Sequence, residues 1–288
     1  MHDNVIRLAV FGKTGAGKTS FVVSATGELF EIGHGGASCT VNVQAGHVRV
    51  GGKNVILIDT PGFDDTESRD PEIFETIAAW LAKSRAQGKE LNGVIFMQPI
   101  TDPRVPNSER NRTRLFKKII GDQFYGRVAI VTTMWDQVRE SFGEQNERTR
   151  TSENFVWGDM LVRGAQIFRF QNTQQSALEV VRHFTENPSM SAPAPTLLQD
   201  ELQAHEGRLR DTSAAKQFEI DLGKKVNDLQ LSIQSLGGNR PMEARVQAIQ
   251  TWRSRLKNIV MKINWKGFLE VIGLSNDILE LANSCATM

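Results

Sequence analysis

The chain lacks the features that mark secreted, zinc-stapled or membrane-spanning proteins. Its two cysteines, Cys39 and Cys285, lie far apart, so we expect neither a disulfide framework nor a cysteine zinc site, and we expect a reducing, cytoplasmic location. No apolar run is long enough to span a bilayer, and the apolar start lacks the basic lead of a secretory signal. A formal net charge of +1 gives no general attraction to nucleic acid. These absences favour a soluble protein that does not bind nucleic acid.

The most informative segment that is present is a glycine-rich turn near the start. Four residues separate Gly12 from the triplet Gly17-Lys18-Thr19, between an apolar run and a helix-compatible run; this is the strand–turn–helix order of a P-loop. Glycine lets successive backbone amides point at phosphate oxygens, and the helix N-terminus adds partial positive charge. We expect Lys18 to reach the β- and γ-phosphates and Thr19 to hold Mg²⁺. The predicted phosphate-binding residues are Gly12, Lys13, Thr14, Gly15, Ala16, Gly17, Lys18, Thr19 and Ser20.

Two further segments have the pattern of loops that respond to the terminal phosphate. An apolar run ends in Asp59-Thr-Pro-Gly62, where Asp59 can orient a Mg²⁺ water and the Gly62 amide can bond the γ-phosphate. Between this motif and the P-loop, a glycine-rich stretch precedes Thr40, whose hydroxyl could close over Mg²⁺. Thr40 is the expected metal ligand and Ser38 the alternative; an ordinary polar loop is the other interpretation.

Two later segments are candidates for reading the nucleotide base. Thr133-Met-Trp-Asp136 follows an apolar run, and a carboxylate at Asp136 can accept two hydrogen bonds from guanine, a donor pair that adenine lacks. Met134 stands where GTPases usually have a lysine whose stem covers the base, and a methionine can also lie on an aromatic face. Trp135 could pack in the core instead. Asn172, after the last predicted strand, could bond the guanine carbonyl or cap the helix that follows it.

Strand-like and helix-like windows alternate over the first part of the chain, as a mostly parallel sheet covered by helices requires. The second and third strands are joined by Gly51-Gly52-Lys53, so we expect them to form an antiparallel hairpin at the edge of the sheet. The predicted strands are 5–11, 41–50, 54–58, 93–98, 127–132 and 166–170. The predicted helices are 18–25, 71–85, 108–120, a stretch within 141–163, and 174–185. The fold class is therefore α/β with a C-terminal helical extension.

The composition changes after residue 186. Prolines at 188, 193 and 195 indicate a linker, which divides the chain into a nucleotide-binding domain (1–186), a linker (187–195) and a helical extension (196–288). Within the extension, apolar residues recur at helical spacing from Phe218 to Leu236 and again from Val246, and an amphipathic segment, 268–281, follows. A basic excess over 240–266 indicates either a helical hairpin with oppositely charged faces or attachment to an anionic membrane or a partner protein.

The motifs together resemble those of septin-like GTPases of the translocon and immunity-associated type. Segments 38–44, 59–64 and 133–136 are similar to the group's Ser-x-Thr-x-x-x-Gln, Asp-Thr-Pro-Gly-Phe-Asp and Thr-x-x-Asp patterns, and the nearest likeness is to fungal G-domain proteins with a tryptophan in the last segment. The resemblance covers about residues 5–186. It implies a Ras-like P-loop G domain that binds GTP or GDP with Mg²⁺, forms a homodimer across the nucleotides, and hydrolyses GTP slowly unless paired.

The catalytic residues follow partly from this resemblance. Phe63 stands where many small GTPases have a water-orienting glutamine, and a phenyl ring cannot position water, so we expect slow intrinsic hydrolysis. In the immunity-associated group an arginine between the third and fourth motifs acts across the dimer. Arg104 is the matching candidate here, and Arg110 or Arg112 is the alternative. The expected catalytic set is Lys18, Thr40, Gly62 and Arg104.

The expected function is a Mg²⁺-dependent, GTP-binding switch or assembly scaffold in the cytoplasm, with peripheral membrane attachment as one use of the extension. An ATP-using P-loop phosphotransferase is an alternative, although the chain shows no arginine-rich lid. A scaffold that binds GTP, dimerises and never hydrolyses it is another, and Phe63 keeps that interpretation open.

Overall fold

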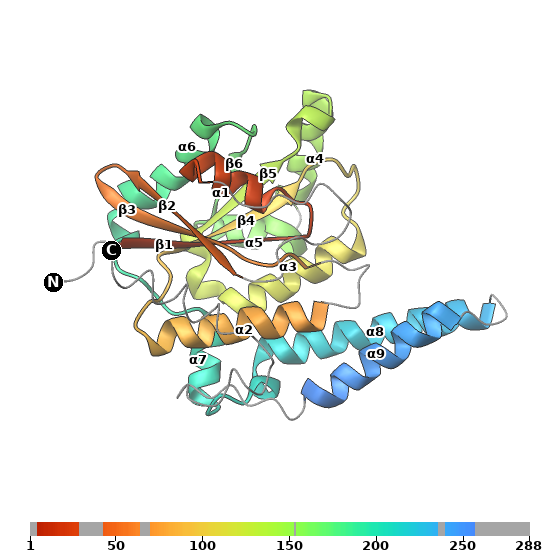
Figure 1. Ribbon diagram of the computed structural model, residues 1–288. Helices are drawn as coiled ribbons and strands as arrows, with labels where there is room; N and C mark the ends of the chain where they lie inside the picture. The colour runs from red at the N-terminus through yellow and green to blue at the C-terminus, as the bar shows by residue number, and fades with distance from the viewer. Residues whose placement is uncertain (1–4, 29–42, 64–69, 153, 236–239, 257–288) are drawn as a thin grey trace.

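A computed structural model describes residues 5–28, 43–63, 70–152, 154–235 and 240–256. Within these ranges six strands form one sheet in the order β2-β3-β1-β4-β5-β6 (Figure 1). The strands are β1 (Val5–Gly12), β2 (Gln44–Val50), β3 (Lys53–Asp59), β4 (Gly93–Pro99), β5 (Val128–Thr133) and β6 (Gln166–Arg169). The helices are α1 (Lys18–Thr26), α2 (Asp70–Ala86), α3 (Asn107–Ile120), α4 (Glu140–Ser152), α5 (Asp159–Val162), α6 (Gln174–Glu186), α7 (Leu197–Ala204), α8 (Ser213–Ser235) and α9 (Arg240–Leu256).

The pairing of the strands agrees with the predicted fold class. Neighbouring strands are parallel except for β2 and β3, which are antiparallel. Gly51 and Gly52 join these two with φ of 59° and 79°, the left-handed pair that a tight hairpin turn requires. The predicted antiparallel edge hairpin is therefore confirmed, and the carboxyl ends of β1, β3, β4 and β5 lie along one edge of the sheet.

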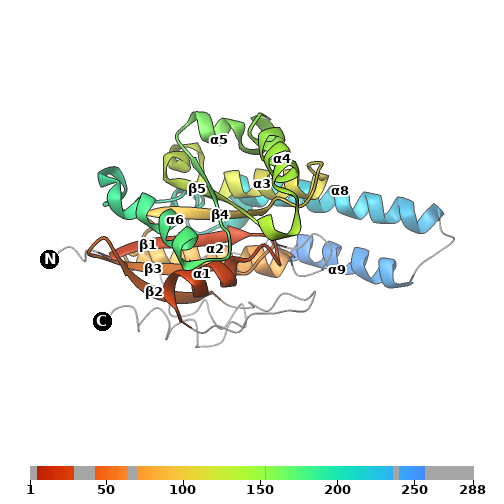
Figure 2. The ribbon, with the colours of Figure 1, turned by 90° about the horizontal axis from the view of Figure 1, so that it is seen from above.

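Helices cover both faces of the sheet, as buried parallel strands need. On one face, β-strand residues such as Leu8 and Leu57 pack against α1 and α6. On the other face, Phe11 and Phe96 pack against α3, where the ring of Phe96 stacks on that of Phe116 at a centroid distance of 3.9 Å. The strands lie between α1 and α6 above and α2 and α3 below in Figure 1, and in the view from above α1 and α6 lie in front of the sheet (Figure 2).

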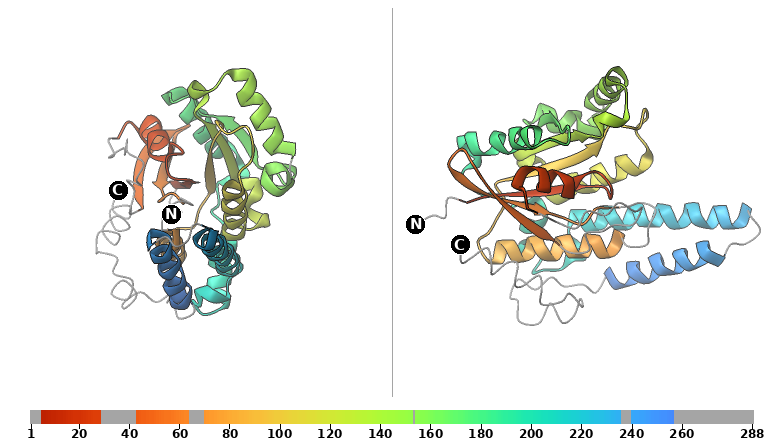
Figure 3. Two further views of the ribbon diagram at one scale, coloured as in Figure 1. Left: turned by 90° about the vertical axis from the view of Figure 1, so that its right-hand side faces the viewer. Right: turned by 45° about the horizontal axis from the view of Figure 1, so that its top comes forward.

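The C-terminal helices complete the second of these cores. Leu198 of α7, Phe218 of α8 and Trp252 of α9 are buried in the same apolar cluster as α2 and α3. The rings of Phe74, Phe218 and Trp252 form a chain from α2 to α9, with successive centroid distances of 5.0 and 5.4 Å. Helices α8 and α9 lie antiparallel and extend beyond the α/β body (Figure 3). No helix within the described ranges is long and apolar enough to cross a bilayer.

The predicted linker 187–195 is bonded to the end of the sheet. The Asn92 side chain donates to the carbonyls of Met190 and Ser191 at 2.9 and 3.0 Å, and the Arg127 guanidinium donates to the carbonyl of Ala192 at 2.8 Å. After it, Thr196 and Gln199 form a capping box that starts α7. The domain boundaries remain a prediction, but the two parts share one apolar core.

Candidate nucleotide site

The P-loop joins the end of β1 to the start of α1. Gly12 passes so close to β4 that a Cβ there would lie 2.6 Å from the Met97 carbonyl oxygen. Gly15 and Gly17 have φ of 74° and 86°, and Gly17 is the N-cap of α1; residues with a Cβ rarely adopt these angles. The sequence-predicted turn thus has the strand–turn–helix setting that a phosphate-binding loop needs.

Lys18 lies inside this turn, where its side chain is 6% exposed. Its ammonium donates to the carbonyl oxygens of Lys13 at 3.0 Å and Gly12 at 3.4 Å. Burial lowers the pKa of Lys18 to about 8, and the nearby negative charge of Asp59 offsets only part of that effect. The ammonium has therefore lost most of its hydration without gaining a full counter-charge, a deficit that a bound polyphosphate would remove.

Thr19 and Asp59 bring two oxygens together beside the turn. The Thr19 hydroxyl donates to Oδ2 of Asp59 at 2.6 Å, and Asp59, at the end of β3, is 1% exposed. Hydroxyl and carboxylate oxygens are the hard ligands that Mg²⁺ prefers, and this cation usually keeps several waters. The residues present therefore fit a magnesium nucleotide, in which Thr19 would be the direct ligand and Asp59 would bind a water of the cation.

Gly62 lies directly on the P-loop. The Thr14 hydroxyl donates to the Gly62 carbonyl at 3.0 Å, and the Thr14 amide donates to the Phe63 carbonyl at 3.2 Å. A Cβ at Gly62 would lie 2.6 Å from the backbone nitrogen of Thr14 and 2.5 Å from Nζ of Lys18, so only glycine fits this approach. Sequence analysis named Thr14 as a phosphate-loop residue and did not foresee its hydroxyl bond, which joins residues 48 positions apart.

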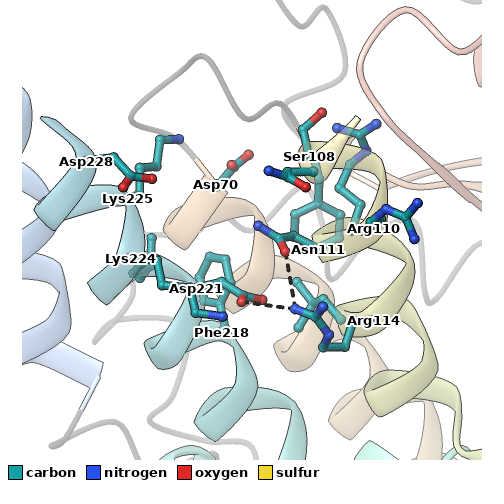
Figure 4. A pocket seen from close by; sticks show the side chains of 15 residues that line it. Asp70, Ser108, Arg110, Asn111, Arg114, Phe218, Asp221, Lys224, Lys225 and Asp228 are labelled. Atoms are coloured by element: carbon teal, nitrogen blue, oxygen red, sulfur yellow. Dashed lines mark hydrogen bonds and ion pairs between the residues drawn. The ribbon is translucent and has the colours of Figure 1, made fainter. Parts of the chain in front are cut away.

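The side chain of Phe63 is buried in the core that contains α2 and α3. It also borders a pocket of about 450 Å³ between the start of α3, the start of α2, and α8 (Figure 4). In this pocket Arg114 of α3 pairs with Asp221 of α8 at 3.4 Å. Phe63 therefore lies between Gly62, which contacts the P-loop, and the pocket that α8 borders.

The predicted base-reading segment follows β5 and is tied to the P-loop. Thr133 is 2% exposed, and its hydroxyl donates to the Ala16 carbonyl at 3.0 Å. Met134 has φ of 64°, an unusual value for a residue with a Cβ, and the one-turn 3₁₀ helix Trp135–Gln137 follows. Asp136 is exposed. Trp135 packs against the protein, in agreement with the core alternative for this residue.

Asn172 precedes α6 and is exposed, with φ of 55°. The helix-capping alternative for Asn172 is wrong, because Thr173 occupies the N-cap and its hydroxyl accepts from the Ser176 amide at 3.2 Å. A contact with the base remains the prediction for Asn172.

The other predicted site residues are Ser20, Ser38, Thr40 and the candidate arginines. Ser38 and Thr40 lie outside the described residues. Ser20 lies in the first turn of α1 and is partly exposed. Arg104 is exposed on the segment between β4 and α3, whereas Arg110 lines the pocket beside α8. An arginine that acts on a second molecule must be exposed, which is the case for Arg104.

Comparison with known proteins agrees with this geometry. A family model described as 50S ribosome-binding GTPase matches residues 7–121, which run from β1 to the residue after α3. No curated protein sequence matches the chain.

Solved structures share the fold at low sequence identity. Toc33 from Arabidopsis thaliana in complex with Mg²⁺ and GMPPNP is 15% identical, with a TM-score of 0.51 over 65% of this chain and 85% of that chain. A structure of the chloroplast translocon components atToc33 and psToc159 is also 15% identical, with a TM-score of 0.53 over 67% of this chain and 86% of that chain. Together with the sheet order and the P-loop, these matches show that the fold is a Ras-like P-loop G domain, followed by C-terminal helices.

Proposed function

We propose that this protein binds GTP and GDP with Mg²⁺, hydrolyses GTP slowly on its own, and hydrolyses it faster when two G domains pair. The observation that carries the proposal is the buried Lys18 ammonium, with its lowered pKa, inside a glycine turn and against Gly62. A buried cation without a full counter-charge is costly, and a polyphosphate at this position relieves the cost. The GTPase family match over the same residues supports this assignment.

Each residue then has a distinct part in holding the nucleotide. Lys18 and the amides of the P-loop bind and orient the phosphates, and Thr19 holds the cation with Asp59 behind it. Bound Mg²⁺ supplies positive charge that the phosphate oxygens need during hydrolysis. The Gly62 amide would bond the terminal phosphate, and Asp136 would accept hydrogen bonds from guanine.

Slow intrinsic hydrolysis follows from Phe63. Its ring is buried in the core and provides no polar atom to orient water. A positive charge from a second molecule would then be needed, and Arg104 is exposed to provide it. A solved relative of the same fold is described with the words that dimerization is important for the GTPase activity of atToc33 and psToc159. This supports the pairing part of the proposal.

Binding is tested with fluorescent GTP and ATP analogues on the whole chain. We expect GTP to bind more tightly than ATP, and Lys18→Ala to abolish binding of both while circular dichroism shows a retained fold. Unchanged GTP affinity in Lys18→Ala would remove the assignment. Tighter binding of ATP would favour a P-loop phosphotransferase.

Pairing is tested by phosphate release at increasing protein concentration. We expect the specific activity to rise with concentration in the wild type and to stay low in Arg104→Ala with GTP affinity unchanged. Arg148→Ala is the matched control, because Arg148 is an exposed arginine on α4. Flat activity in the wild type would refute trans activation, and no phosphate at any concentration would identify a non-hydrolysing scaffold.

The extension is part of the proposed switch. Phe63, next to Gly62, and Phe218 of α8 line the same pocket and belong to the same apolar cluster, so we expect a shift at Gly62 to reach α8 through this cluster. Arg253 of α9 lies 3.7 Å from Glu219 of α8, which supports the helical-hairpin interpretation of the basic segment. Binding of the extension to an anionic membrane or a partner protein remains the alternative use, and sedimentation with phosphatidylserine vesicles distinguishes the two.

A further inference from the structure

Trp135 sits in a closed arrangement of side chains directly behind the base-reading segment. Its indole N–H donates to the Thr132 hydroxyl oxygen at 3.0 Å. The Arg169 guanidinium lies over the ring, with its central carbon 4.2 Å from the ring centroid. Helix α4 approaches closely at Gly143, where a Cβ would lie 2.5 Å from Cζ3 of the indole. The indole is thus held by a hydrogen bond, a cation–π contact and close packing on α4.

Arg169 is itself fixed by acidic residues of α4. Its guanidinium donates to Oε2 of Glu147 at 2.7 and 3.3 Å, and Glu144 lies 3.7 Å away. The hydrogen bond and negative charge of Glu147 raise the pKa of Arg169. The other oxygen of Glu147 accepts from the Thr132 hydroxyl at 3.1 Å. Contacts therefore run from Trp135 to Thr132, to Glu147, to Arg169 and back to Trp135.

The base-reading segment is otherwise bonded at its start, where the Thr133 carbonyl accepts from the Ile100 amide at 3.1 Å. A single 3₁₀ turn has little stability of its own, and Met134 is in a left-handed conformation that costs free energy. Thr133 ties the start of the segment to Ala16, but Asp136 comes three residues later on the exposed side. The indole at 135 is the neighbour of Asp136 in the chain, so anchoring the ring fixes the backbone from which the carboxylate projects.

We propose that Trp135, Arg169 and Glu147 are positioning residues that hold Asp136 in the orientation that reads the base, and that base selectivity depends on them. The inference rests on the proposed binding of GTP. A guanidinium stacked on an indole and bonded to Glu147 thus supports a segment in which Met134 stands in place of the usual lysine.

The test compares GTP, ITP and ATP affinities of the whole chain by competition against a fluorescent GTP analogue. Arg169→Gln removes the stacked charge, and Glu147→Gln removes the carboxylate while keeping the size of the side chain. In both variants we expect the preference for GTP over ATP to fall roughly tenfold, because misorientation weakens the charge-assisted bonds that Asp136 makes, while ATP affinity stays within about twofold. Arg163→Gln is the matched control: Arg163 pairs with Asp122 at the other end of the domain.

A second comparison separates positioning from general stability. If Arg169 acts through Asp136, then Arg169→Gln added to Asp136→Asn leaves the GTP-to-ATP preference of Asp136→Asn unchanged, whereas independent effects would add. Trp135→Phe, which keeps an aromatic ring but removes the N–H donor and the five-membered ring of the indole, gives a smaller loss than Arg169→Gln. Unchanged selectivity in folded Arg169→Gln and Glu147→Gln, or an equal loss for all three nucleotides, overturns the inference. A wild type that binds no nucleotide refutes the proposed function itself, and a wild type that binds GTP and ATP equally overturns only base reading.

Discussion

Nucleotide binding should be accompanied by proton uptake at mildly alkaline pH, because Lys18 has a pKa of about 8 before any phosphate is bound. A polyphosphate favours the charged ammonium and so raises this pKa toward its ordinary value of 10.5. The nucleotide thus selects the protonated form. Affinity should be highest below pH 8 and should weaken by up to about tenfold per pH unit above it.

The size of the uptake follows from the titration of one group. With a pKa of about 8, about half of the molecules carry a neutral Lys18 at pH 8 and roughly a tenth do at pH 7. Binding should therefore take up about half a proton per nucleotide at pH 8 and much less at pH 7. Without nucleotide, the unfolded state binds more protons at Lys18 than the folded state does between about pH 8 and 10.5. The free energy of unfolding should therefore rise with pH across that window, by about 3 kcal/mol in total.

Isothermal titration calorimetry with GDP and Mg²⁺ measures this uptake directly, from the dependence of the heat on the ionisation enthalpy of the buffer. GDP avoids heat from hydrolysis. Lys18→Arg is the control, since a guanidinium stays charged throughout this range, and any binding that it retains should show no uptake. Tight wild-type binding at pH 8 without proton uptake would refute the argument from burial of the ammonium.

Three substitutions test other parts of the structure. Asp136→Asn should lower the affinity for GTP by roughly tenfold or more and shift the preference toward xanthine nucleotides in competition assays. Unaltered base selectivity would count against a role of Asp136 in reading the base. Gly62→Ala adds a methyl 2.6 Å from the backbone nitrogen of Thr14, which would push the Gly62 amide away from the P-loop. GMPPNP affinity should therefore fall more than GDP affinity, and equal losses would contradict the proposed bond from Gly62 to the terminal phosphate. Glu109→Gln leaves the fully buried Arg150 without its carboxylate and should cost about 3–5 kcal/mol in urea unfolding. Adding Arg150→Met should recover part of that loss, and a stable single variant would contradict the prediction.

The sheet could be predicted closely because its signal is local. β3 and β5 are apolar runs bounded by polar or glycine residues, and a buried parallel strand needs no more than that. The hairpin between β2 and β3 followed from two adjacent glycines, which the structure places in the left-handed region. Helix α7 lies at the start of the predicted helical extension (196–288), but its bounds were not predicted, although Thr196 and Gln199 have the capping-box spacing.

The phosphate part of the site was also predictable from a local signal, since the P-loop is one continuous segment with fixed spacing. The side-chain contacts that support the site could not be predicted. The Thr133 hydroxyl reaches the Ala16 carbonyl across 117 positions of sequence, and Arg169 meets Trp135 only because β5 and β6 are neighbours. Side-chain contacts of this kind depend on strand order and helix placement, which no local spacing encodes.

The bonding of the stretch 187–195 to the sheet bears on how the chain responds to cleavage. A protease that cuts there should nick the backbone without releasing the distal piece, because Asn92 and Arg127 grip this stretch and Leu198 and Phe218 beyond it are buried against α2 and α3. A chain shortened to end at residue 186 would instead uncover that apolar surface and should aggregate.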